Sequence, residues 1–167
     1  MAKVRGLRKL NKAVTIQLQP FGIEKAECLD SYAYYRDSNR ITFKLTEGTL
    51  EDRWFMEFVK ERFNYNVKYP FIFSLLHEVG HHITDDDIDD MTYNFCEGEK
   101  AFIDEKMQTA DIKQSKELEW KYFGLPDEIL ATTWAVEYMQ SHPIKVERMW
   151  SEILVALEEF YRKNGLI

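Results

Sequence analysis

The segment from Pro70 to Thr84 constrains the fold most, because its apolar residues are distributed all around a predicted helix. Pro70 suits the first helical turn, where the missing N–H of proline costs no hydrogen bond. The apolar residues of the segment are Phe71, Ile72, Phe73, Leu75, Leu76, Val79 and Ile83. A helix that is apolar nearly all round is usually buried. The sequence therefore predicts a helix over 70–84 that lies inside the molecule.

Four polar side chains interrupt this apolar helix, namely His77, Glu78, His81 and His82. Burying a polar group without a partner costs roughly 2–7 kcal/mol, so each of them needs a compensating bond. His77 and His81 are four residues apart and lie on one helix face, where both imidazoles can bind one metal ion. Glu78 is offset by roughly 100°, where it can accept a proton from a water that the metal activates. The alternative is a core helix whose histidines bond to other protein groups.

A catalytic zinc ion usually has three protein ligands, so two histidines leave the predicted site incomplete. Glu128 lies in the first turn of a second predicted helix, over about 126–140. It shares one face with Ala131 and Thr132, whose small side chains would let this helix approach the first one closely near Gly80. We therefore predict Glu128 as the third ligand. The alternative is a glutamate that is placed in a first turn because it interacts favourably with the helix dipole.

Three other residues near the two motifs are weaker candidates for the third position. Glu137 is about 180° from Glu128 around its helix, so the two cannot both face one metal. Asp85 shares the face of the two histidines but lies about 9 Å of rise beyond their midpoint. We expect Asp85 to accept a hydrogen bond from the outer nitrogen of His81 instead. His82 points about 100° away from His81, and the sequence assigns it no role.

The rest of the chain predicts one small sheet and several helices. The run from Tyr32 to Leu45 has aromatic and β-branched residues on both sides of a polar stretch, residues 36–40, which is typical of an antiparallel hairpin. Residues 14–18 alternate in the manner of a strand, and residues 4–12 are expected to form a short helix. Further helices are predicted over 49–62, 112–123, 126–140 and 144–162, with one or two more in the polar segment up to about residue 110.

The two motifs resemble those of gluzincins, which are zinc metallopeptidases with H-E-x-x-H on one helix and a Glu ligand on a later one. More narrowly, they resemble those of the ImmA/IrrE-like peptidases. The run from His77 to His81 is similar to the H-E-L-G-H of that family. Residues 128–135 are similar to its E-x-x-A-N-x-F-A, with Thr132 in place of Asn and Trp134 in place of Phe. The predicted hairpin also has a counterpart in the family.

This resemblance implies a fold and a set of residue roles. The expected fold class is α+β and zincin-like, with a small antiparallel sheet packed against a mainly helical body that contains a buried active-site helix. His77, His81 and Glu128 would bind Zn²⁺, and Glu78 would act as general base and later as proton donor.

Two features depart from the family pattern. Asp85 stands where family members often have a further His, and 46 residues (82–127) separate the two ligand motifs. We therefore expect residues 1–167 to form a single domain in which about 86–124 is a polar, mostly helical insertion between the ligand helices.

Peptide hydrolysis also needs a group that stabilises the developing oxyanion, in addition to the metal. Tyr138 follows Glu128 on the same predicted helix and His142 lies just beyond its end, and we predict both as candidate catalytic residues for this role. His142 is fourteen residues after Glu128, close to the same face if the helix persists that far. Pro143 argues against this, because the residue before a proline avoids the helical conformation.

The sequence thus predicts a zinc-dependent peptidase that hydrolyses peptide bonds in a protein partner. The alternatives are a non-catalytic zincin-like module that binds a regulatory protein and a metal-dependent hydrolase of a non-peptide substrate. A net charge of −7 argues against general nucleic-acid binding. No apolar run approaches the ~20 residues that span a bilayer. Cys28 and Cys96 form no disulfide framework, which favours a cytoplasmic location.

The acidic run over residues 85–90 has two interpretations. It is either a solvated face or an electrostatic attraction for basic substrates near the site. Neither the identity of the substrate nor the oligomeric state follows from the sequence.

Overall fold

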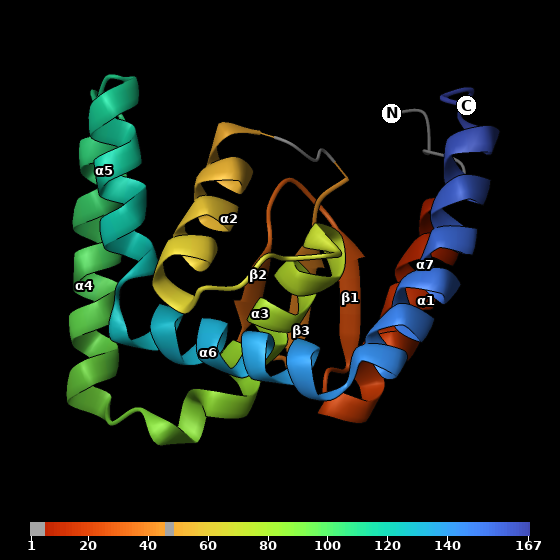
Figure 1. Cartoon of the computed structure of the whole chain (residues 1–167), viewed down its shortest axis with the longest axis horizontal. Helices are drawn as coiled ribbons and strands as arrows, with labels where there is room; N and C mark the ends of the chain where they lie inside the picture. Colours follow the sequence, from red (N-terminus) through yellow and green to blue (C-terminus); the bar gives the residue numbers. More distant parts are fainter. Residues whose placement is uncertain (1–5, 46–48) are drawn as a thin grey trace.

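The computed structural model describes residues 6–45 and 49–167, which form α-helices and a three-stranded sheet (Figure 1). Helices α4 and α5 lie side by side at one end and α1 and α7 at the other, with α3, α6 and the sheet between them. This mainly helical arrangement with a small sheet is consistent with the predicted α+β class. The helices are α1 (Leu7–Leu18), α2 (Leu50–Phe63), α3 (Pro70–Thr84), α4 (Asp90–Met107), α5 (Ile112–Phe123), α6 (Pro126–Ser141) and α7 (Pro143–Lys163), and the strands are β1 (Lys25–Cys28), β2 (Ala33–Tyr35) and β3 (Arg40–Phe43).

The sheet is mixed, so the prediction of a purely antiparallel sheet is wrong. Strands β2 and β3 form the predicted antiparallel hairpin, in which Tyr35 pairs with Arg40. Strand β1 was not predicted, because the segment Lys25–Cys28 is too short and too polar to show a clear alternation. It pairs with β3 in parallel, which gives the order β1-β3-β2. The hairpin strand β2 is therefore an edge of the sheet, and β3 is its buried centre.

The strand predicted over residues 14–18 is wrong, because these residues belong to α1. Leu10, Val14 and Leu18 are all fully buried at a spacing of four residues, which is the period of a helix face. The alternation over residues 14–18 covers only part of this longer helical pattern, so it resembled a strand. The helix predicted over 4–12 corresponds to the start of α1, and its residues 4 and 5 lie outside the described part of the chain.

Helix α3 has the predicted bounds and is buried in the middle of the molecule. Strands β2 and β3 contact it, and α6 packs along it. Gly80 allows the two helices to approach closely, since a Cβ at this position would lie 2.5 Å from the backbone oxygen of Ala131 and 2.9 Å from its Cα. The small-residue face predicted on α6 therefore meets α3 at Gly80, as expected. This contact fixes the distance between the two helices that carry the motifs.

The segment predicted as a polar insertion forms the short 3-10 turn η2 (Asp85–Asp87) and the helix pair α4 and α5. Its few buried residues attach it to the rest of the protein. Cys96 and Ile103 of α4 pack with Leu125, and Phe123 of α5 packs with α2. The pair is thereby held next to the start of α6, where Glu128 lies.

None of the helices in the described residues is both long enough and apolar enough to cross a membrane.

Candidate metal centre

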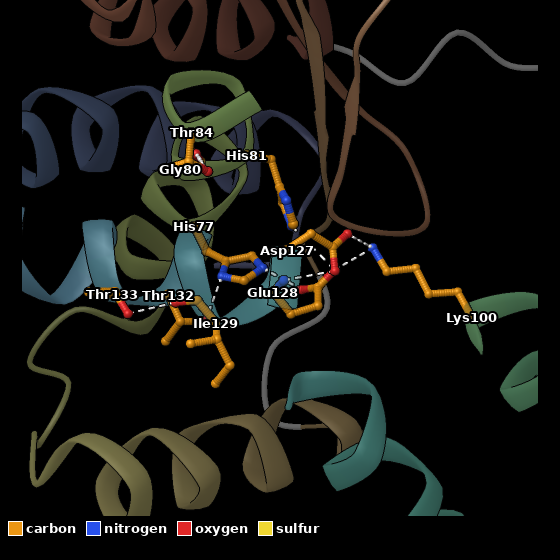
Figure 2. Close-up of polar contacts among 10 residues, drawn as sticks. All are labelled: His77, Gly80, His81, Thr84, Lys100, Asp127, Glu128, Ile129, Thr132 and Thr133. Carbon is orange, nitrogen blue, oxygen red and sulfur yellow. Dashed lines mark hydrogen bonds and ion pairs between the residues drawn. The ribbon is translucent and has the colours of Figure 1, made fainter. Parts of the chain in front are cut away.

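Three potential ligands meet where α3 packs against α6 (Figure 2). His77 Nε2 lies 2.9 Å from Glu128 Oε2, and His81 Nε2 lies 3.4 Å from Glu128 Oε1. One ligand atom from each residue lies within 4.8 Å of the other two. The side chains are 7%, 16% and 4% exposed for His77, His81 and Glu128 respectively. This buried group could hold a metal ion.

The other ring nitrogen of His77 has its own partner on α6. Nδ1 lies 3.1 Å from the hydroxyl oxygen of Thr132, which is fully buried. When Nδ1–H donates to this hydroxyl, the lone pair of Nε2 remains available for a metal. The ring of Phe55 packs edge-on against His77, with 5.1 Å between the ring centroids. Thr132 and Phe55 together fix the orientation of the imidazole. The sequence had indicated only the small size of Thr132.

Lys100 is a charged member of the site that sequence reasoning missed. It extends from α4 toward α6, where its Nζ lies 2.7 Å from Glu128 Oε1 and 2.5 Å from Asp127 Oδ2 (Figure 2). The ammonium group also lies 5.2 Å from the ring centroid of Tyr122, on α5. The backbone N–H of Glu128 donates to Asp127 Oδ1. Lys100 thus pairs with the carboxylate of the third potential ligand, and Asp127 shares the same ammonium group.

The Glu128 carboxylate dominates the electrostatics of the metal-free site. Burial opposes its charged form, but His81 and His77 outweigh this and hold the pKa of Glu128 well below its usual range. Burial also opposes a charge on His81, yet the nearby Glu128 carboxylate raises the pKa of His81 to about 9. A metal ligand must be a neutral imidazole, so metal binding here would release the proton from His81.

Glu78 lies on α3 beside the ligands and lines the same cavity, which has a volume of about 1070 Å³. Its side chain is almost completely buried, with 8% of the residue exposed. Burial raises the pKa of the Glu78 carboxyl, against the attraction of His77 and His81. A carboxylate with a raised pKa is a better proton acceptor near neutral pH. Glu78 is therefore suited to act as a general base on a molecule in the cavity.

The structure places Tyr138 and His142 away from this cavity. Their rings stack on each other with a centroid distance of 4.4 Å, and Tyr138 stacks on Trp134 at 5.2 Å. They form an aromatic cluster at the C-terminal end of α6, whereas Glu128 lies in its first turn. Neither residue lines the cavity. Lys100 and Tyr122 line it instead.

The three weaker candidates for the third ligand, Glu137, Asp85 and His82, do not belong to the ligand group. Glu137 is exposed on the outer face of α6. Asp85 accepts a hydrogen bond from Arg36 Nε at 2.8 Å, so the predicted bond from His81 is replaced by an ion pair with the β2–β3 turn. His82, which had no predicted role, bonds through Nδ1 to the hydroxyl of Tyr34 at 2.9 Å. Arg36 and Tyr34 thus attach the hairpin to the end of α3.

Comparisons with models of protein families, with curated proteins and with solved structures found no match to this chain. The functional argument consequently rests on the arrangement of its side chains. That arrangement consists of two imidazoles and one carboxylate that converge, a second carboxylate beside them, and a cavity that all four line.

Lys100→Met should destabilise the metal-free protein by about 3 kcal/mol, because two adjacent buried carboxylates lose their shared counter-charge. Lys116→Met is the matched control. Its ammonium group lies 2.7 Å from Glu57, but both side chains are about half exposed, so its removal should cost less than about 1 kcal/mol. Urea unfolding in the presence of a chelator measures both. Equal effects of the two variants would show that Lys100 does not compensate the buried charge.

Proposed function

We propose that this protein is a zinc-dependent peptidase of the gluzincin type. The observation that carries the proposal is the position of Glu78. It is a buried carboxylate that lines the cavity next to His77, His81 and Glu128. A metal site with a purely structural role needs its ligands but has no use for an additional carboxylate beside them. The resemblance of the two motifs to those of ImmA/IrrE-like peptidases supports the same proposal.

Zinc is the metal that best suits these donors. Two imidazoles and one carboxylate are a ligand set of catalytic zinc sites, in which a fourth position stays open. When bound, zinc would act as a Lewis acid that polarises a carbonyl group and lowers the pKa of water. Thr132 and Lys100 support this assignment, because bonds to the outer atoms of metal ligands orient those ligands.

The side chains of the protein supply the remaining chemistry. Glu78 accepts a proton from the attacking water and delivers it to the nitrogen of the leaving amine, as the peptide C–N bond breaks. The ammonium group of Lys100, which lines the cavity, favours the negative charge that develops on the carbonyl oxygen. In this proposal Lys100 takes the role that sequence reasoning gave to Tyr138 and His142.

The edge strand β2 offers a way to hold a peptide in the cavity. Its residues Ala33, Tyr34 and Tyr35 all line the cavity. In the sheet, β2 has a neighbouring strand, β3, on one side only. An extended peptide can add to such an edge through backbone hydrogen bonds. A peptide bound in this way would extend across the metal centre. The exposed strand edge therefore favours a peptide over a small non-peptide substrate.

Metal analysis of the purified protein tests the ligand set. We expect close to one zinc per chain in the wild type and little in His77→Ala or Glu128→Ala, because each variant loses one of three ligands. Glu137→Ala is the control, since Glu137 lies on α6 but is exposed. Circular dichroism verifies that each variant is folded. Full zinc content in Glu128→Ala would show that Glu128 is not a ligand. Zinc loss in Glu137→Ala would indicate that Glu137 takes part in metal binding.

A non-catalytic module that binds a regulatory protein is separated from an enzyme by the hydrolysis of peptides. Zinc-loaded protein is incubated with a library of quenched fluorescent peptides, and cleavage is followed by fluorescence and mass spectrometry. Zinc-dependent cleavage, lost with a chelator and restored by added zinc, is the expected result. A folded, zinc-loaded protein that cleaves no peptide of the library would contradict the proposed activity.

A further inference from the structure

Helix α4 carries an exposed apolar stripe that the proposed function does not use. Met91, Phe95 and Phe102 are 81%, 55% and 47% exposed, although all three side chains are large and apolar. Gly98 lies between the two phenylalanines, and a Cβ there would meet no atom within 4 Å. These four residues, which we call the α4 stripe, follow one another at intervals of four, three and four residues. This is the spacing of the seam along which two helices pack in a coiled coil.

The α4 stripe faces away from the rest of the protein. Cys96 and Ile103, the buried residues of α4, lie roughly 140° around the helix axis from the stripe. Tyr93 and Glu97, which line the metal cavity, lie roughly 150° from it. Helices α4 and α5 form one end of the molecule, so another molecule can reach this face (Figure 1). A partner that covers the stripe would therefore leave the metal cavity open.

The two ends of the stripe differ in charge. At one end, Lys106 and Lys121 flank Phe102, with their ammonium groups 5.4 and 5.6 Å from the centroid of its ring. At the other end, the acidic run of residues 85–90 directly precedes Met91. A surface that is acidic at one end and basic at the other is complementary to a second copy of itself in the opposite orientation. Charge thus indicates another copy of this chain as the partner.

We propose that the α4 stripe is the centre of a symmetric homodimer in which two α4 helices pack antiparallel. Phe95 and Ala101 are each three residues from Gly98, and Asp90 and Lys106 are each eight residues from it. With Gly98 near the two-fold axis, Phe95 faces the partner's Ala101 and Asp90 faces the partner's Lys106, and each contact occurs twice. Large side chains then meet small ones, opposite charges meet, and the rings are removed from water. This inference is independent of the proposed peptidase function, because it concerns the opposite face of α4.

Sedimentation velocity of the full chain, at protein concentrations of about 1–200 µM, measures the dimer and its dissociation constant. We expect the wild type to change from monomer to dimer within this range. Phe95→Glu should raise the dissociation constant about a hundredfold or more, because a charge at the centre of the interface would lose its hydration. Val155→Glu is the matched control, since Val155 is 67% exposed but lies on α7, at the other end of the molecule. Circular dichroism verifies that each variant is folded.

Two charge reversals test the antiparallel orientation. Asp90→Lys and Lys106→Asp should each weaken the dimer about tenfold, because like charges would then meet at both ends of the interface. An equimolar mixture of the two variants should recover the affinity of the wild type. Each heterodimer in the mixture again brings an acidic group opposite a basic one at both ends. Both positions are exposed, so these variants test the interface even if Phe95→Glu does not fold.

Four results would overturn this inference. A wild type that stays monomeric over the whole range would leave a different protein as the occupant of the stripe. A dimer that folded Phe95→Glu leaves intact, or that Val155→Glu weakens equally, would use another face. Growth beyond the dimer with rising concentration would indicate an open head-to-tail contact instead of a two-fold one. A mixture of the two charge variants that recovers no affinity would exclude the antiparallel orientation.

Discussion

Glu78→Gln should lower the rate of peptide hydrolysis by about 10³-fold or more while the protein keeps its zinc. Glutamine has nearly the same shape as glutamate but cannot accept the proton of the attacking water, and general bases commonly contribute about 10²- to 10⁴-fold. Glu78 belongs to the same helix as His77 and His81, so a substitution of similar volume leaves the helix and its ligands in place. Cleavage of the peptide library and metal content per chain are measured on the same preparations.

Glu97→Gln is a suitable control for this prediction. Glu97 also lines the metal cavity, but it lies on α4 and is exposed, so loss of its charge should change the rate by less than about threefold. Unchanged hydrolysis in Glu78→Gln would mean that another group accepts the proton. Loss of zinc in Glu78→Gln would mean that Glu78 helps to bind the metal. Either result would require a different mechanism.

The sequence predicted the convergence of the ligands because each motif lies on a single helix. The four-residue spacing of His77 and His81 places both on one helix face, whatever the rest of the fold is. The small residues after Glu128 determined which face of α6 turns inward, and Gly80 provided the matching gap on α3. These are local properties of helices, and they are therefore contained in short stretches of sequence.

Lys100 was missed because its role depends on contacts between distant segments. It meets Asp127 and Glu128 only after α4 and α5 have folded back onto the start of α6. One signal was present in the sequence. Lys100 is spaced four residues after Cys96 and three before Ile103, which are the buried residues of α4. A lysine on the buried face of a polar helix needs a negative partner, and that requirement could have marked it as a site residue.

The position of Tyr138 and His142 outside the cavity has a related cause. Helix periodicity gives the direction of a side chain around the axis, but the distance along the axis decides whether it reaches a site. Tyr138 is ten residues after Glu128, or about 15 Å of rise. At that distance it contacts Phe21 and Trp134 and does not line the cavity. The sheet order was likewise not predictable, because β1 pairs with a strand twelve or more residues away and has no strong pattern of its own.

Gly80→Ala should both destabilise the fold and weaken metal binding. A Cβ at residue 80 would lie 2.5 Å and 2.9 Å from backbone atoms of Ala131, whereas ordinary contacts begin near 3.4 Å. The atoms in the way belong to the backbone of α6, so a side-chain rotation cannot relieve the clash and the two helices must separate. Overpacking of this kind costs about 1–3 kcal/mol, and sometimes more. Thermal unfolding in the presence of a chelator measures this cost.

The effect of Gly80→Ala on the metal follows from the position of the ligands on both helices. His77 and His81 move with α3 and Glu128 moves with α6, while metal–ligand distances tolerate only about 0.2 Å. We expect zinc affinity to fall by about tenfold to a hundredfold, as measured by competition with a chelator of known affinity. Gly98→Ala is the matched control, since Gly98 lies within α4 and a Cβ there meets no atom within 4 Å. That variant should gain up to about 1 kcal/mol of stability from helix propensity alone and keep its zinc affinity. If both alanines behave alike, the close contact of α3 with α6 does not set the geometry of the metal centre.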